Sequence, residues 1–181
     1  EIVIGWRQFD NVKSNFRQAG WAYSSDGGQT WIFPGSIRPG HFNSDPVLDY
    51  DNEGNFYYNA LNSTSIDDWP CYIYKSNNGG KSWDNGIYIG GGDKQWMTID
   101  RSGGIGEGNI YSAWSLPTSE CAPGFFTRST DNGNSYEDCI SIPQEPYSAT
   151  LAVGNDGELY VGGRSPFTEA VKVAKSTDAQ D

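Results

Sequence analysis

The sequence predicts an all-β fold, a β-propeller of four-stranded antiparallel blades with about three and a half blades present. The first observation is a repeat. The polar, glycine-containing stretch at residues 24–31 recurs at 76–83 and 129–136, and starts again at Ser176. A repeat of roughly 50 residues with one hairpin signal in each is typical of propellers and related β arrays. The second observation is composition, because 7 Trp, 11 Tyr, 8 Phe and 23 Gly favour strands and turns over long helices.

The repeated stretch predicts a tight turn between two strands. Short polar side chains such as Ser24 and Asp26 accept hydrogen bonds from nearby backbone N–H groups. Gly27 and Gly28 supply the positive φ angles that such a turn requires. Trp31 then starts the next strand and buries a large apolar surface. Because the stretch is present in several repeats, we interpret it as structural and not as a single chemical site.

The first two expected repeats cover residues 1–40 and 41–90. Apolar stretches in the first predict strands at 2–6, 19–23 and 31–33, and we expect its innermost strand to be missing before Glu1. The second is complete, with strands expected at 46–48, 56–58, 72–74 and 87–89. Its first strand follows Asp45 and begins with Pro46, which suits a position where no ladder N–H is needed.

The third and fourth expected repeats cover residues 91–143 and 144–181. The third predicts strands at 96–100, 110–114, 125–127 and 140–142, and the fourth predicts them at 149–153, 159–161 and 171–173. A propeller closes with about 4 to 8 blades, so three and a half leave exposed strand edges. We therefore expect a fragment of a longer protein, with self-association through the open blade edges as the alternative.

Charge and hydropathy narrow the class of partner. The chain has 23 acidic and 12 basic residues and a net charge of −11, which argues against nucleic acid as a partner. The mean hydropathy is −0.62, and no apolar run approaches the roughly 20 residues of a membrane span. This composition fits a protein that is extracellular or at the cell surface.

Three cysteines, Cys71, Cys121 and Cys139, leave the disulfide pattern open. A bridge from Cys71 to Cys121 would join neighbouring loops, a bridge from Cys121 to Cys139 would lie within one repeat, and buried free thiols are the third alternative. None of the three forms a Cys-x-x-Cys pair, and His41 is the single histidine. The sequence therefore predicts no metal site and no cofactor.

The repeated turns resemble the Asp-box of the sialidase-like (BNR repeat) propellers, Ser-x-Asp-x-Gly-x-Thr-Trp. Residues 24–31 match at every fixed position, the second copy has Asn78 and Ser82, and the third ends in Ser135 and Tyr136. The resemblance implies glycan recognition or glycoside hydrolysis by the full-length parent. It leaves open whether the chain is an enzyme, because a non-catalytic adhesion or assembly module can use the same fold as a scaffold.

The resemblance also implies where the ligand site lies, on the face opposite the turns. There Arg7 is expected to bind ligand and Asp10 to act as the catalytic acid/base, and Asp45 falls where the family has an acidic ligand contact. Asp93 takes a comparable place to Asp45 and is a candidate for binding a sugar hydroxyl, and Trp96 is a candidate stacking platform for a sugar. The alternatives are an anchoring ion pair for Arg7, a solvated loop position for Asp10, and strand capping or packing for the others.

This chain departs from the family's catalytic pattern in three respects. It has no Arg-Ile-Pro arginine, since Ser36-Ile37-Arg38-Pro39 is a different motif. The family's nucleophilic tyrosine with its glutamate, and its two later arginines, have no counterparts here. In that family three arginines hold one carboxylate through charge-assisted bidentate bonds. We therefore expect these 181 residues not to supply a full sialidase site.

Overall fold

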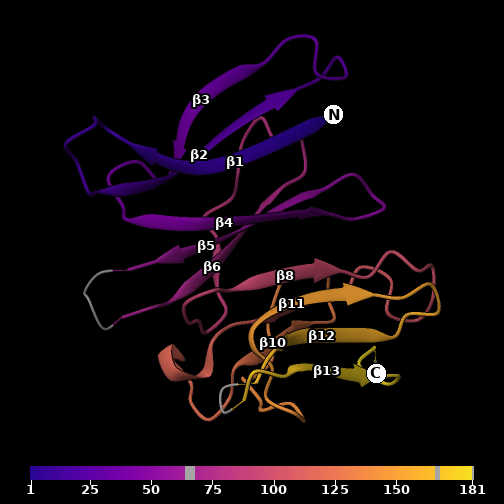
Figure 1. Cartoon of the computed structure of the whole chain (residues 1–181). Coiled ribbons are helices and arrows are strands. Elements are labelled where there is room, and N and C mark those ends of the chain that lie inside the picture. The colour runs from indigo at the N-terminus through magenta and orange to yellow at the C-terminus, as the bar shows by residue number, and fades with distance from the viewer. Residues whose placement is uncertain (64–67, 166–167, 181) are drawn as a thin grey trace.

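The computed structural model describes residues 1–63, 68–165 and 168–180, which form four antiparallel sheets in chain order (Figure 1). Sheets A and B contain β1 Ile2–Phe9, β2 Arg17–Ser24 and β3 Ile32–Ile37, then β4 Asn43–Tyr50, β5 Phe56–Asn62, β6 Cys71–Ser76 and β7 Ile87–Tyr88. Sheets C and D contain β8 Trp96–Ile99, β9 Ile110–Ala113 and β10 Phe126–Ser129, then β11 Tyr147–Val153, β12 Leu159–Arg164 and β13 Val171–Ser176. The prediction of an all-β partial propeller is confirmed.

The sheets line up when the repeated turns are used as the reference. In sheet B the turn joins the third strand, β6, to the fourth, β7. In sheet A the turn follows β2, so β1, β2 and β3 correspond to the second, third and fourth strands of sheet B. In sheet D the turn follows β13, and the described residues contain no fourth strand there.

The prediction of a fourth strand at residues 140–142 is wrong in its extent. Only Ile140 pairs with sheet C, through one isolated bridge to Phe126 with N–H···O distances of 2.9 and 3.2 Å. Beyond it, the Ser141 hydroxyl donates to the Pro123 carbonyl at 2.6 Å. Pro143 has no N–H group to continue a ladder, so the chain leaves the sheet at this point.

The start of the first strand in sheet B is also corrected. β4 begins at Asn43, so Asp45 lies inside the strand and not before it. The pairing with β5 shifts register between Ser44 and Val47, and Asp45 has a φ of 52°. Such a bulge bends the strand and re-aims side chains next to it.

The strands that come first in the chain within each sheet, β1, β4, β8 and β11, are neighbours through the molecule. β4 contacts β1 on one side and β8 on the other, and β8 also contacts β11 (Figure 1). Apolar side chains fill the spaces between sheets. Between sheets B and C they include Tyr57, Ile73, Met97, Ile110 and Trp114.

None of the helices in the described part of the chain has the length and apolar character needed to cross a bilayer.

The repeated turns close on their own side chains. Ser24 Oγ accepts the N–H of Gly28 at 2.8 Å, and Asp26 accepts the hydroxyl of Thr30 at 2.6 Å and its N–H at 2.9 Å. These hydrogen bonds lower the pKa of Asp26 to about 2, and the bond from the Thr30 hydroxyl has the largest effect. In the second copy, Asn78 Oδ1 accepts the N–H of Ser82 at 3.0 Å while its amide donates to the Ser82 hydroxyl at 2.7 Å. An amide therefore replaces the carboxylate without loss of the turn.

Each later turn also bonds to the sheet that precedes it. The Trp21 indole N–H on sheet A donates to the Gly80 carbonyl of the second turn at 2.8 Å. The Tyr57 hydroxyl on sheet B reaches the Asn132 carbonyl of the third turn at 3.2 Å. The Asn109 amide, just before β9 of sheet C, donates to the Gln180 carbonyl of the fourth turn at 3.2 Å. The turns therefore join successive sheets as well as successive strands.

Acid should destabilise this fold through Asp51 in the β4–β5 turn. Its carboxylate accepts the N–H of Asn55 at 2.8 Å, the amide of Asn55 at 2.7 Å and the hydroxyl of Tyr57 at 2.9 Å. Burial is the largest influence and raises the pKa of Asp51, but these hydrogen bonds together outweigh it and the pKa is lowered. A carboxyl with a lowered folded-state pKa stabilises above its unfolded pKa of about 3.9, and this stability is lost as the pH falls through the folded value.

We expect the free energy of unfolding to fall steadily between about pH 5 and pH 2. Asp51→Asn should cost about 1–3 kcal/mol at pH 7 and make the acid loss shallower, because one titrating group is removed. Urea unfolding at four pH values measures both effects. An acid dependence identical in the wild type and the variant would contradict the assignment.

Candidate ligand site at the ends of the first strands

A pocket of about 380 Å³ lies where four strands from the four sheets come together at one end. β1 contributes Arg7. Sheets B, C and D each contribute three consecutive residues, 45–47, 94–96 and 148–150. The three triplets occupy equivalent places, at or just before the first strand of sheets B, C and D. Equivalent residues of three successive sheets therefore line the pocket.

The backbone is unusual at the first residue of each triplet. Asp45, Lys94 and Ser148 have φ values of 52°, 59° and 49°. Positive φ is uncommon for residues other than glycine and costs of order 1–3 kcal/mol. A strained conformation repeated in three sheets places the following residue, Pro46, Gln95 or Ala149, against the pocket.

Arg7 and Asp45 form an ion pair across the gap between β1 and β4. The side chains are 44% and 21% exposed, so the pair lies at the rim of the pocket. The Ser44 hydroxyl also donates to Asp45 at 2.9 Å. A guanidinium carries five N–H donors, and the pair with Asp45 uses Nη2. Arg7 is thus held in position with donors available for a further polar group.

Gln95 lines the pocket and has an unpaired side-chain acceptor. The residue is 2% exposed, and its Nε2 donates to the Asp45 carbonyl at 2.5 Å. Its Oε1 is buried and has no hydrogen-bond partner among the described residues. Buried polar atoms are nearly always paired, and an unpaired one costs about 1–3 kcal/mol.

Trp96 adds an apolar surface beside these polar groups. The residue lines the pocket and is 43% exposed. Its carbonyl accepts the Ser112 hydroxyl at 2.8 Å, which helps to fix the backbone at this position. The pocket therefore combines a flat aromatic surface, a buried acceptor and a charged donor.

Two of the predicted site residues lie outside the pocket lining. Asp10 is exposed, and its Oδ1 accepts the Gln18 amide at 2.7 Å. Asp93 pairs with the ammonium of Lys94 at 2.9 Å and donates its backbone N–H to Thr118 at 2.7 Å. The structure thus brings Arg7, Asp45 and Trp96 together and leaves Asp10 and Asp93 apart from them.

Sequence reasoning expected residues 93–96 and 145–148 on the ligand face but assigned no individual role to Lys94, Gln95 or Ser148. The signal available was the repeat itself, because Lys94 and Ser148 stand at the position of Asp45 in the next two repeats. A search for acidic residues passed over them. The open oxygen of Gln95 has no sequence signal, since it depends on burial.

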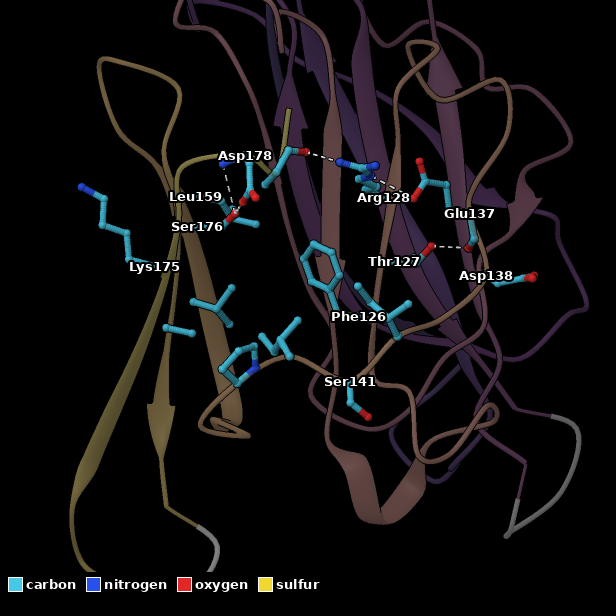
Figure 2. A pocket seen from close by; sticks show the side chains of 16 residues that line it. Phe126, Thr127, Arg128, Glu137, Asp138, Ser141, Leu159, Lys175, Ser176 and Asp178 are labelled. Atoms are coloured by element: carbon cyan, nitrogen blue, oxygen red, sulfur yellow. Dashed lines mark hydrogen bonds and ion pairs between the residues drawn. The ribbon is translucent and has the colours of Figure 1, made fainter. Parts of the chain in front are cut away.

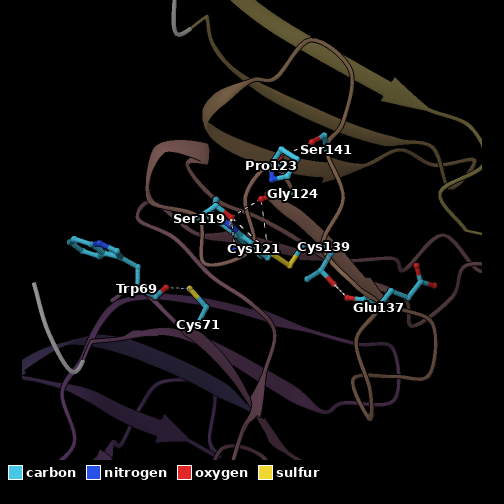
Figure 3. Close-up of a disulfide and its surroundings, with 11 residues drawn as sticks. Trp69, Cys71, Ser119, Cys121, Pro123, Gly124, Glu137, Cys139 and Ser141 are labelled. Atoms are coloured by element: carbon cyan, nitrogen blue, oxygen red, sulfur yellow. Dashed lines mark hydrogen bonds between the residues drawn. A yellow bond between two sulfur atoms is a disulfide. The ribbon is translucent and has the colours of Figure 1, made fainter. Parts of the chain in front are cut away.

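Cysteine chemistry does not enter this site. Cys121 and Cys139 form a disulfide, whereas Cys71 is a buried free thiol (Figure 3). Of the three alternatives left by the sequence, the bridge within one repeat is the one present, and the bridge from Cys71 to Cys121 is wrong. Burial raises the pKa of the Cys71 thiol to about 12, so it is not a reactive nucleophile. Within the described residues, no group of three or more His, Cys, Asp or Glu side chains is placed to hold a metal ion.

A second cavity, of about 340 Å³, lies between sheets C and D (Figure 2). Its walls are strand faces, residues on both sides of Cys139 and the fourth turn, and not the ends of first strands. Figure 2 shows Phe126 and Leu159 reaching into this space from opposite sides.

No protein-family model matches the sequence, and no curated protein is similar to it in sequence. Solved structures share the fold. A protein of unknown function from Dyadobacter fermentans has a TM-score of 0.66 at 15% identity, covering 98% of this chain and 62% of the other. An exo-β-1,3-galactanase from Phanerochaete chrysosporium, with β-1,3-galactotriose, has a TM-score of 0.58 at 11% identity, covering 99% and 45%.

The Hadza microbial sialidase has a TM-score of 0.56 at 14% identity, covering 90% of this chain and 38% of the other. This chain therefore spans less than two thirds of each of these three proteins. At these identities the likeness shows the fold, a partial β-propeller similar to those of glycosidases.

Proposed function

We propose that this chain carries a carbohydrate-binding site of a secreted or cell-surface propeller, and that the site is the pocket around Trp96. The observation that carries the proposal is the combination of an exposed indole, a buried unpaired acceptor on Gln95 and the Arg7–Asp45 ion pair. A volume of about 380 Å³ is within the roughly 300–1,000 Å³ of small-molecule sites.

Each group matches one part of a sugar. The indole of Trp96 offers a flat apolar surface for the C–H face of a pyranose or furanose ring. Gln95 Oε1 accepts a hydroxyl, and Arg7 donates to a hydroxyl or carboxylate oxygen. The galactanase and sialidase that share the fold support this class of ligand. The partner of the chain is then a free carbohydrate or a glycoprotein.

Binding is favoured over hydrolysis for these residues. Most glycoside hydrolases use two carboxyl groups that flank the scissile bond. Among the described residues that line the pocket, Asp45 is the one carboxylate, and Arg7 pairs with it. Hydrolysis by the full-length parent would need further groups. The catalytic role of Asp10 and the ligand role of Asp93 stay predictions.

Titration calorimetry against β-1,3-galactotriose, arabinobiose and sialyllactose tests the proposal. We expect saturable binding of at least one sugar, and Trp96→Ala should weaken it about tenfold, or about 1.4 kcal/mol. Phe33→Ala is the matched control, because Phe33 is an exposed aromatic, at 66%, outside the pocket lining. Absence of binding to all three sugars, or equal loss in both variants, would favour the scaffold alternative.

A further inference from the structure

The charged groups that line the pocket around Trp96 are neutralised in pairs. Arg7 is paired with Asp45, and the Lys94 ammonium donates to both carboxylate oxygens of Asp93, at 2.9 and 3.0 Å. The other described residues of the lining carry no charge. This lining therefore presents polar groups to a ligand without an excess of positive charge.

The Arg7–Asp45 pair offers a donor and an acceptor side by side. Arg7 uses Nη2 for Asp45, so Nη1 and Nε keep their N–H groups for a ligand. Within the described residues, the hydrogen bonds to the Asp45 side chain, from Arg7 and from Ser44, both end on Oδ1. Oδ2 therefore keeps its lone pairs for a donor. Two neighbouring hydroxyl groups fit this arrangement, because one accepts from Arg7 while the other donates to Asp45.

A carboxylate on the ligand fits the same pair less well. It has no proton to donate to Asp45 at neutral pH, and it brings a second negative charge close to the Asp45 carboxylate. A guanidinium that is already paired attracts another anion less strongly, because the two charges of the pair largely cancel. The net charge of −11 on the whole chain also repels an anion.

Sheet D contributes hydroxyl groups to the pocket in place of charges. Ser148 and Thr150 line it from β11, and both residues are exposed. A hydroxyl both donates and accepts, so these side chains match sugar hydroxyls in either orientation. Ser148 takes the place that Asp45 has in sheet B and Lys94 has in sheet C. The third of the equivalent positions is therefore uncharged.

We infer that the pocket takes a neutral sugar with two adjacent free hydroxyl groups and discriminates against uronic and sialic acids. The inference rests on the proposed carbohydrate site and narrows its class of ligand. Of the two groups that Arg7 is able to bind, a hydroxyl and a carboxylate, the site selects the hydroxyl. Asp45 sets this preference, because its carboxylate neutralises Arg7 and repels a second carboxylate.

Sugar pairs that differ only at C6 test the inference on the whole chain. Methyl β-D-galactoside is compared with methyl β-D-galacturonide, and methyl β-D-glucoside with methyl β-D-glucuronide, by NMR titration followed at the Trp96 indole. We expect the neutral member of at least one pair to bind about tenfold more tightly than its acidic partner. Its affinity should change by less than about twofold between about 20 and about 500 mM NaCl, because no net charge is neutralised.

Equal or tighter binding of the acidic members would overturn the inference and leave the carbohydrate site standing. No binding of any of the four sugars would also overturn it, while the calorimetry with oligosaccharides decides the carbohydrate site separately. These comparisons use the wild-type chain, so they do not depend on the folding of a variant.

Asp45→Asn tests the residue that sets the preference. Asparagine has nearly the same shape, readily adopts the positive φ found here, and leaves Arg7 without a charged partner. We expect the acidic sugars to bind about tenfold more tightly to this variant than to the wild type, with the gain lost at high salt. Asp138→Asn is the matched control, because it removes the same charge from an exposed residue outside the pocket lining, and it should change neither affinity. An unchanged preference in a folded Asp45→Asn variant would contradict the inference.

Discussion

Trp114→Ala should lower the free energy of unfolding by about 3–5 kcal/mol, the usual cost of removing a fully buried tryptophan. Trp114 is 0% exposed and belongs to the core between sheets B and C. Its indole N–H donates to the Ser119 hydroxyl at 2.8 Å, so the substitution also removes a partly buried hydrogen bond. Gly90 and Gly92 approach the ring closely, and their lack of a side chain leaves no group that could fill the cavity.

Urea unfolding followed by circular dichroism measures this loss. Trp96→Ala is the matched control, since the same side chain is removed at a position that is 43% exposed, and we expect it to change stability by less than about 1 kcal/mol. A similar loss in the two variants would mean that Trp114 is not a core residue. Together they separate a tryptophan that stabilises the fold from one assigned to binding.

Removal of the disulfide should have the next largest effect. Cys121 and Cys139 are separated by 18 residues, and opening a loop of that length costs about 3 kcal/mol by chain entropy. The bond also holds the segment that follows the third turn against the loop before β10. This stabilisation acts where the fourth strand of sheet C is reduced to a single bridge at Ile140.

The double substitution Cys121→Ala and Cys139→Ala, compared with the wild type by urea unfolding, measures that cost. Cys71→Ala is the control, because it removes a buried thiol without opening a loop, and a loss of about 1 kcal/mol is expected there. If the double variant were as stable as the wild type, the disulfide would have no structural role in this region.

The fold was predictable because its signal is local and repeated. Hydrogen bonds within residues 24–31 involve neighbours in sequence, so the pattern of Ser, Asp and Gly is visible without the structure. Two features were not predictable in the same way: the absence of a full strand at residues 140–142 and the start of β4 at Asn43. Both depend on where the ladder stops or shifts register, which is decided by contacts between segments far apart in the chain.

The candidate site was predictable only in part. Arg7, Asp45 and Trp96 came from the resemblance and their positions near first strands, and the structure places them around one pocket. Gln95 was given no role because an amide becomes informative only when it is buried with an unpaired oxygen. The positive φ angles of Lys94 and Ser148 were also hidden, because neither residue type indicates that conformation.

We propose that sugar binds in the pocket at the ends of the first strands. Two-dimensional NMR of the chain labelled with nitrogen-15, titrated with β-1,3-galactotriose, tests it most directly. The predicted result is a saturable set of shifts that includes the Trp96 indole N–H, the Gln95 side-chain amide and the backbone N–H of Ser148. Shifts confined to the repeated turns or to the groove between sheets C and D, or no shifts up to millimolar sugar, would contradict it.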